Sequence, residues 1–329
     1  MTTNKKTLLL TDTMAACGKA LLDARDDIET ISFPHITGRE DFQALLAKHA
    51  PVSAVALGPT RISTEELDAA DGMAVVARIG VGYDAIDVPV LSSRKIPLMI
   101  AGTANSPSVA EQAIFMMMAL AKRVAELDAI VRQDNWSRRM EAVPFDLLDK
   151  TVLIVGFGRI GTRTAKRCAA FDMNVLVFDP YVDETEISDA GYTPISDLDT
   201  AVAQADFITL HCPKNPETIG LMDAERLARM KPTAYLVNTA RGGIIDEIAL
   251  HAALTAGKLA GAGLDVFAQE PVAPDNPLLK LDTVIAAPHM AGVTKESRDR
   301  MSVAAATNIL SVFDGAIVRE NVVNQDVLD

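Results

Sequence analysis

Three ionisable residues in the second half of the chain each follow an apolar run of strand-like composition. Arg241 comes after TAYLVN, Glu270 after LAGAGLDVF, and His289 at the end of TVIAAPH. Parallel strands end along one edge of their sheet, and ligands of open α/β folds bind outside that edge. We therefore expect a guanidinium, a carboxylate and an imidazole to gather at one edge of a parallel sheet.

Such a trio suits the transfer of a hydride to or from a carbon that carries oxygen. A carboxylate beside a histidine stabilises the imidazolium, so the ring donates a proton to a ketone at neutral pH and recovers it in the reverse direction. A guanidinium orients and polarises the carbonyl. Each residue taken alone has an alternative: a surface arginine before a Gly-Gly turn for Arg241, and a structural histidine for His289. Their shared position after strands of one predicted sheet favours catalysis.

The stretch GFGRIG at 156–161 predicts a site for a phosphate chain. It has the pattern G-x-G-x-x-G and lies between the apolar run TVLIV and a helical stretch. Gly156 permits the tight turn, Gly158 lets the backbone approach a pyrophosphate, and Gly161 lets helix and strand pack closely. The free N–H groups at the start of the helix favour an anion. By itself this motif is weak evidence.

Asp179 strengthens the prediction. It ends the next apolar run, NVLVFD, about 20 residues after the glycines, where an acidic residue accepts the ribose hydroxyls of a dinucleotide. A carboxylate at this position disfavours the additional phosphate of NADP. The alternative is a structural glycine turn with a surface aspartate. With both halves in register, we predict NAD as the cofactor.

The elements that must position these residues form two alternating series. The first hundred residues contain the apolar runs KTLLL, DIETIS, VSAVAL, MAVVAR and IPLMI, separated by helical stretches such as 14–25 and 38–49. A long helix is predicted over 105–133. A second series starts at TVLIVG, with helices predicted at 159–171, 196–204, 223–229 and 246–256, and the chain closes with a helix from about 295 to 313. Strands that alternate with helices predict two α/β units, each a Rossmann-like doubly wound parallel sheet.

The bulk composition excludes several classes of protein. A chain of 329 residues is long enough for two domains, and its net charge of −13 disfavours binding to nucleic acid or anionic lipid. The cysteines Cys17, Cys168 and Cys212 lack metal-ligand spacing, so we predict no metal and a reducing compartment. Neither the N-terminal run TLLL nor the longest apolar run, AIFMMMALA, is long enough for an export signal or a membrane span. A cytoplasmic protein is therefore expected.

Taken together, the motifs identify a resemblance to the D-isomer-specific 2-hydroxyacid dehydrogenase family, nearest to its phosphoglycerate dehydrogenase and hydroxypyruvate/glyoxylate reductase branches. The resemblance covers nearly the full length. It rests on RIGVGYDAID, NSPSVAE, GFGRIG, HCPKNPET, VNTARGG, GLDVFAQEP and APHMAG, which stand in the order of the family.

The resemblance implies a role for each matching residue. His289 would be the acid/base, Glu270 its partner, and Arg241 the group that binds the carboxylate and carbonyl of the substrate. The implied cofactor contacts, besides the three glycines, are Arg159, Ile160, Asp179, Cys212, Thr239, Ala240, Asp265 and Gly292. The implied substrate contacts from the other domain are the backbone at Val81 and Gly82, together with Asn105.

The resemblance also implies a domain arrangement. Residues 1–101 and 293–329 would form a discontinuous substrate-binding domain, and residues 102–292 the NAD-binding domain. The active site would lie in a cleft between them, and a homodimer would form through the cofactor domain. The expected activity is NAD-dependent oxidation or reduction at C2 of a small 2-hydroxy or 2-keto acid. The alternative is an NAD(H)-sensing binding protein of the corepressor kind, which shares this fold and these residues.

The positions of basic residues indicate whether the protein can bind a substrate with a second anionic group. In the phosphoglycerate branch, arginines bind the substrate phosphate at positions that correspond here to Gly58 and Thr60, which disfavours 3-phosphoglycerate. Cations remain at Arg61 and Arg78. Two more stand in WSRR, Arg138 and Arg139, which by the resemblance would come from the partner subunit; the alternative for them is a solvated basic patch.

Overall fold

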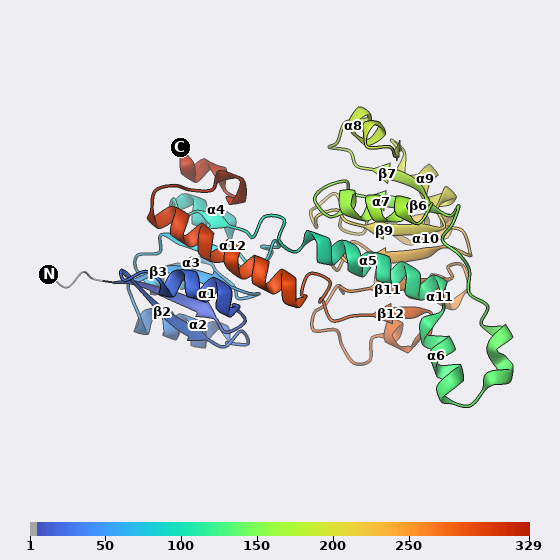
Figure 1. Ribbon diagram of the computed structural model, residues 1–329, viewed down its shortest axis with the longest axis horizontal. Helices are drawn as coiled ribbons and strands as arrows, with labels where there is room; N and C mark the ends of the chain where they lie inside the picture. Colours follow the sequence, from blue (N-terminus) through green and yellow to red (C-terminus); the bar gives the residue numbers. More distant parts are fainter. Residues whose placement is uncertain (1–4) are drawn as a thin grey trace. The chain divides into compact units, whose positions relative to one another are not determined.

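Two parallel sheets organise the chain in the computed structural model, which describes residues 5–329 (Figure 1). The first unit runs to Asn105 and resumes over Gly292–Asp329, and the second is Ser106–Ala291. The sequence places these borders at 101/102 and 292/293. The first border lies later because Ala101 N–H donates to the Gly80 carbonyl and Arg300 donates to the Ala104 carbonyl, which ties this stretch to the first unit. Residues 1–4 of the predicted first domain lie outside the described residues.

The first unit contains a five-stranded parallel sheet in the order β2-β1-β3-β4-β5. Its strands are β1 (Lys6–Thr11), β2 (Ile28–Phe33), β3 (Val52–Leu57), β4 (Val75–Arg78) and β5 (Leu98–Met99). Its helices are α1 (Ala16–Asp23), α2 (Arg39–Lys48), α3 (Thr64–Ala70), α4 (Val88–Ser93) and α12 (Lys295–Phe313). Side chains of α1 and α12 fill the core on one face of the sheet, and those of α2, α3 and α4 fill the other. Burial on both faces explains the nearly continuous apolar character of β3 and β4, whereas the edge strand β2 contains both buried and exposed residues.

Helix α12 returns the end of the chain to this first sheet. It packs along α1, where a Cβ on Gly18 would lie only 2.4 Å from the Ser302 carbonyl oxygen. Asn308 of α12 is buried and donates through Nδ2 to the Ile100 carbonyl at 2.9 Å. The predicted closing helix is therefore confirmed, and it belongs to the first unit.

The second unit contains a seven-stranded parallel sheet in the order β12-β11-β10-β9-β6-β7-β8. Its strands are β6 (Thr151–Val155), β7 (Asn174–Phe178), β8 (Thr193–Pro194), β9 (Phe207–Leu210), β10 (Tyr235–Asn238), β11 (Gly261–Leu264) and β12 (Val284–Ala286). Its helices include α5 (Ser106–Ala121), α6 (Val124–Arg132), α7 (Gly161–Ala170), α8 (Glu184–Asp189), α9 (Leu198–Gln204), α10 (Ala224–Arg229) and α11 (Glu247–Thr255). The predicted fold class, two doubly wound parallel α/β units, is confirmed.

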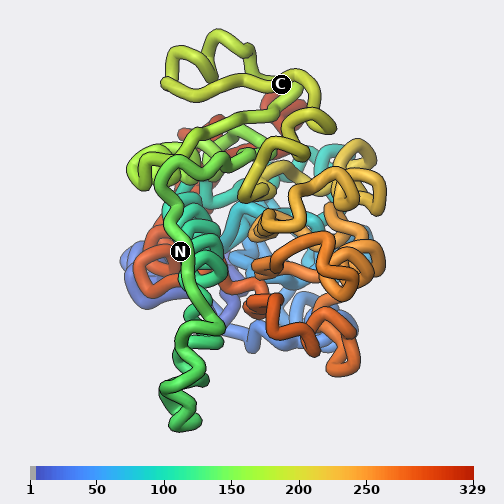
Figure 2. Tube along the Cα trace, turned by 90° about the vertical axis from the view of Figure 1, so that its right-hand side faces the viewer, coloured from blue at the N-terminus to red at the C-terminus, as the bar shows by residue number. Residues whose placement is uncertain are grey.

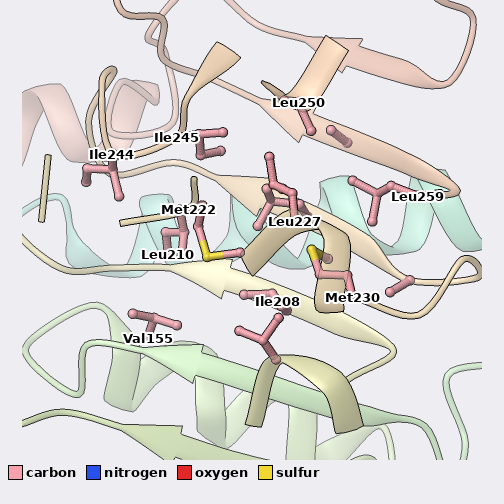
Figure 3. Close-up of a cluster of buried hydrophobic side chains, with 14 of the residues drawn as sticks. Val155, Ile208, Leu210, Met222, Leu227, Met230, Ile244, Ile245, Leu250 and Leu259 are labelled. Atoms are coloured by element: carbon pink, nitrogen blue, oxygen red, sulfur yellow. The ribbon is translucent and has the colours of Figure 1, made fainter. Parts of the chain in front are cut away.

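Helices cover both faces of this second sheet. Side chains of α9, α10 and α11 pack against Val155, Ile208 and Leu210 on one face (Figure 3). Helices α5 and α7 pack on the other face around Ile154 and Val237. The strands are thereby held rigidly, and their carboxyl ends become a stable platform for side chains.

The predicted helix over 105–133 is wrong in one respect, because it is broken into α5 and α6. Arg123 adopts a left-handed conformation with φ of 48°, and the Ala121 carbonyl accepts a hydrogen bond from Phe145 N–H instead of continuing the helix. After the break, α6 and the 3-10 helix Trp136–Glu141 extend away from the rest of the second unit (Figure 2). Within residues 5–329, none of the helices combines the length and apolar character needed to cross a bilayer.

Candidate active site

The imidazole and the carboxylate predicted to work together are in contact. His289 Nδ1 lies 2.7 Å from Glu270 Oε2, and the other oxygen of Glu270 accepts a hydrogen bond from Phe267 N–H at 2.9 Å. Both side chains are partly exposed, His289 by 48% and Glu270 by 36%. An ionised carboxylate only accepts, so Nδ1 carries the proton that faces Glu270. Nε2 is then the ring atom left to exchange a proton with another molecule.

Asp265 holds the turn on which His289 stands. Its backbone carbonyl accepts from His289 N–H at 2.7 Å, and its two carboxylate oxygens accept from Met290 N–H and Ala291 N–H, each at 2.8 Å. Asp265 is fully buried, and burial raises the pKa of its carboxyl group. This network fixes His289 in a left-handed conformation, with φ of 55°. The role of Asp265 as a cofactor contact stays a prediction, and its bonds within the described residues support the turn of His289.

Arg241 lies in a tight turn directly after β10. Its Nη1 donates to the Ala240 carbonyl at 2.7 Å, and its own carbonyl accepts from Asn238 Nδ2 at 2.9 Å. The next residue, Gly242, packs against the loop that carries Glu270: a Cβ on Gly242 would lie 1.7 Å from the Phe267 carbonyl oxygen. The turn of Arg241 and the loop of Glu270 are therefore in van der Waals contact. Because β10, β11 and β12 are neighbours, the three predicted catalytic residues stand on adjacent loops at one sheet edge.

The glycine loop has the geometry that a dinucleotide requires. Gly156 has φ of 96°, and a Cβ on it would lie 2.7 Å from Cys212 N. A Cβ on Gly161 would lie 1.9 Å from the Gly156 carbonyl oxygen, whereas one on Gly158 would meet nothing within 4 Å. The first and third glycines are thus needed for packing, and the second borders open space for a ligand. Helix α7 begins here after Ile160 without a side-chain cap, and of its first residues Thr162 already donates its N–H to the Gly158 carbonyl at 3.1 Å. The start of a helix is a favourable place for an anion.

Asp179 lies beside this loop in the predicted position. Its Oδ2 accepts from Phe157 N–H at 2.7 Å and its Oδ1 from Tyr181 N–H at 2.9 Å. A carboxylate has about four acceptor positions, so this orientation leaves capacity for hydroxyl groups of a ribose. Arg159, also predicted here, follows Gly158 directly.

Two buried polar atoms along the same sheet edge lack a protein partner among the described residues. They are Thr239 Oγ1, after β10, and His211 Nδ1, after β9. Burial lowers the pKa of His211 to about 3 and raises that of Cys212 to about 11, so both side chains are neutral at pH 7. An unsatisfied buried polar atom is costly unless something else bonds to it. Thr239 therefore suits the predicted role of lining a cofactor site, with Cys212 next to His211 on the neighbouring loop, and NAD fits the residues present.

The predicted substrate contacts on Arg78, Val81, Gly82 and Asn105 belong to the first unit. Arg78 Nε donates to the Gly82 carbonyl at 2.9 Å and so braces the loop that contains Val81. Asn105 Oδ1 is buried without a protein partner among residues 5–329. Gly292, predicted as a cofactor contact, begins the returning segment of this unit and accepts from Ser297 Oγ at 2.8 Å.

The other candidate cations have varied surroundings. Arg61 is exposed and lines a cavity of about 210 Å³ with His35, Arg39 and Thr60. Arg138 pairs with Glu141 at 2.9 Å, and Arg139 lies over the Trp136 ring at 5.8 Å. No group of three or more His, Cys, Asp or Glu side chains within the described chain is placed to hold a metal ion.

Two supporting residues were missed from the sequence, Asn238 and Gly242. The signal for Asn238 was present, because an asparagine at the end of a strand commonly bonds the backbone two residues on. The signal for Gly242 was the Gly-Gly pair itself, which marks either a turn or a close approach of two backbones. Only the structure distinguishes these two possibilities.

Comparison with known proteins supports the interpretation of the second unit as an NAD-binding domain of a dehydrogenase. The family profile described as "D-isomer specific 2-hydroxyacid dehydrogenase, NAD binding domain" matches residues 114–291. A D-3-phosphoglycerate dehydrogenase of Archaeoglobus fulgidus is 41% identical over 80% of this chain, but the match spans only 50% of that protein. A glyoxylate reductase of Thermofilum pendens is 40% identical over 82% of this chain and 80% of its own length.

A solved structure agrees over nearly the whole fold. A D-lactate dehydrogenase from Aquifex aeolicus, complexed with NAD and lactic acid, superposes with a TM-score of 0.83 and is 28% identical; the match covers 96% of this chain and 99% of that one. The profile match lies entirely within the second unit, which carries the glycine loop. That unit is an NAD-binding domain.

Proposed function

Because the chain belongs to the D-isomer specific 2-hydroxyacid dehydrogenase family, we propose that it interconverts a small 2-keto acid and the corresponding 2-hydroxy acid, with NAD as the hydride carrier. Bound NADH supplies the hydride in the direction of reduction. The proposal rests mainly on the 2.7 Å contact between His289 and Glu270. The loop that carries Glu270 also packs against the turn of Arg241.

In this proposal His289 moves the proton. During reduction its Nε2 gives a proton to the substrate oxygen as that oxygen becomes a hydroxyl, and in the reverse direction Nε2 takes the proton back. Glu270 bonds Nδ1, which fixes the orientation of the ring and places a negative charge beside the protonated imidazole. Asp265 keeps the ring in place through the backbone of the turn.

Arg241 binds the substrate. A guanidinium presents a rigid fork of donors that matches a carboxylate, and its charge polarises a neighbouring carbonyl. The contacts expected at Arg78, Val81, Gly82 and Asn105 in the first unit stay predictions, to be tested by substitution.

We propose a small acid as the substrate, with a second anionic group as the finer possibility. One relative of similar length is a glyoxylate reductase, and Gly58 and Thr60 stand where arginines would bind a phosphate. Arg61, Arg138 and Arg139 are the cations that a second acidic group would meet. NADH oxidation measured with glyoxylate, hydroxypyruvate, phosphohydroxypyruvate and sulfopyruvate tests the activity and ranks the substrates.

The same assay separates this proposal from the NAD-sensing alternative. Tight NADH binding without turnover of any keto acid would favour a sensor. A clear preference for NADH over NADPH is also expected, because the carboxylate of Asp179 repels the additional phosphate. Equal turnover of both cofactors would contradict the role of Asp179.

We further propose a homodimer formed through the second unit. Exposed apolar side chains gather on the extension after α5: Val131 (60% exposed), Trp136 (62%) and Met140 (71%). Such side chains are typical of an interface. Light scattering on the purified protein measures the dimer. A cytoplasmic location is proposed because all three cysteines are free thiols, and cell fractionation tests it.

A further inference from the structure

The turn that presents Arg241 is closed by one buried side chain, that of Asn238. Asn238 is 2% exposed, and both ends of its amide are bonded within the turn. Nδ2 donates to the Arg241 carbonyl at 2.9 Å, and Oδ1 accepts from Ala240 N–H at 3.0 Å. The carbonyl of the same Ala240 accepts from Arg241 Nη1 at 2.7 Å. Asn238 thus reaches the guanidinium through Ala240 by two consecutive hydrogen bonds.

Asn238 also links this turn to the support of the acid/base. Its backbone carbonyl accepts from Asp265 N–H at 2.9 Å, and Asp265 in turn holds the His289 turn. On the far side of Arg241, Gly242 abuts the Phe267 carbonyl, and Phe267 N–H bonds Glu270. The contacts form a closed ring, so the Arg241 backbone is fixed on both sides relative to the His289–Glu270 pair.

We propose that Asn238 is a positioning residue that sets where the Arg241 guanidinium lies. It would not touch the substrate, and its effect would be exerted through the turn. This inference rests on the proposed function, since Arg241 must bind substrate for the position to matter. A guanidinium held within a fraction of an ångström of its productive position is what efficient hydride transfer needs, and a displacement of about 1 Å costs on the order of a hundredfold in rate.

The test uses two substitutions in the whole 329-residue chain. Asn238→Ala removes both amide bonds. Asn238→Asp keeps the oxygen that accepts from Ala240 but places a second oxygen against the Arg241 carbonyl, so one bond is lost and replaced by repulsion. Asn324→Ala is the matched control, because Asn324 is 4% exposed and makes the same pair of backbone bonds in the first unit, to Leu98 N–H and the Ile96 carbonyl.

Two measurements are made on each variant. Hydrogen exchange by mass spectrometry is expected to show faster exchange across residues 239–243 in Asn238→Ala and no change there in Asn324→Ala. Steady-state kinetics are expected to show the KM of the keto acid raised about tenfold in both Asn238 variants, as for the loss of about 1.4 kcal/mol of binding. The Kd of NADH, measured by fluorescence, is expected to stay close to that of the wild type.

The outcomes separate the inference from the proposed function. Faster exchange with unchanged KM and kcat would overturn the positioning role, as would an equal rise of KM in Asn324→Ala. If the wild type reduced no keto acid, the proposed function would fail. In that case hydrogen exchange still tests the inference, because unchanged exchange at 239–243 in Asn238→Ala would show that Asn238 does not stabilise the turn. If Asn238→Ala did not fold, Asn238→Ser would replace it, since a serine hydroxyl still accepts from the N–H two residues on.

Discussion

A single methyl group on Gly242 is expected to separate the turn of Arg241 from the loop of Glu270. In the Gly242→Ala variant the new Cβ would lie 1.7 Å from the Phe267 carbonyl oxygen and 2.1 Å from the carbonyl carbon. Cβ atoms essentially never lie closer than 3.0 Å to such neighbours, so the two backbones must separate by more than 1 Å. These neighbours are backbone atoms, and a rotamer change cannot relieve the clash.

The displacement reaches the His289–Glu270 pair through one hydrogen bond. Phe267 N–H bonds Glu270 Oε1, and Glu270 Oε2 bonds His289. A shift of about 1 Å between reacting groups costs roughly a hundredfold in rate, which is about 2.7 kcal/mol at 1.36 kcal/mol per factor of ten. We therefore expect kcat/KM for the keto acid to fall about a hundredfold in Gly242→Ala, while NADH binding at the glycine loop persists.

Steady-state NADH oxidation measures this loss, and thermal unfolding checks that the variant is folded. Gly38→Ala is the control, because a Cβ on Gly38 would meet only Asp41 Oδ2, at an ordinary 3.7 Å. A folded Gly242→Ala protein with kcat/KM within about twofold of the wild type, far short of the effect of an ångström of misplacement, would show that the contact does not set the geometry of the site.

Three further substitutions test other parts of the structure. His289→Gln is expected to lose most turnover in the NADH assay while its NADH affinity, measured by fluorescence, is retained; wild-type turnover would rule out the acid/base role. Glu270→Gln is expected to lower turnover while NADH affinity is retained, because the amide no longer offers His289 Nδ1 a charged acceptor; unchanged turnover would contradict the pairing. Burial raises the pKa of Glu66, but hydrogen bonds including those from Ser63 and Arg39 outweigh it and bring the value to about 2. Since this folded-state pKa is below the unfolded one, Glu66 stabilises the protein above roughly pH 4.3 and loses that effect as pH falls towards 2; Glu66→Gln should lower the free energy of unfolding by roughly 2–3 kcal/mol at pH 7 in denaturant titrations, with a smaller difference at pH 3.

Much of the fold was predictable because local signals and tertiary structure agree. The helix predicted at 246–256 is α11, with Asp246 capping its first turn and Gly257 following its end with φ of 65°. The positions of Arg241 and His289 after strands followed from apolar runs, of which β10 is mostly buried and the edge strand β12 only partly. Here the composition of each segment and the needs of the core favour the same structure.

The remaining features depended on contacts between residues far apart in the chain. The break between α5 and α6 requires Phe145, which bonds the Ala121 carbonyl from beyond the extension, and a helical pattern does not reveal it. Asp265 follows a strand in the same way as a ligand-binding aspartate would, and only its bonds to Met290 and Ala291 show its supporting role. A side chain that bonds backbone several elements away leaves no periodic trace in the sequence.

The strand order of the second sheet places the predicted cofactor residues and the predicted catalytic residues on separate loops. The glycine loop and Asp179 follow β6 and β7, whereas Arg241, Glu270 and His289 follow β10, β11 and β12, with β9 in between. If the proposed function holds, mutations that change the choice of nucleotide fall on the loops after β6 and β7, and those that change the reacting acid fall on the loops after β10, β11 and β12. Such a protein can acquire a new substrate, in evolution or in the laboratory, without changes to the loops that bind NAD.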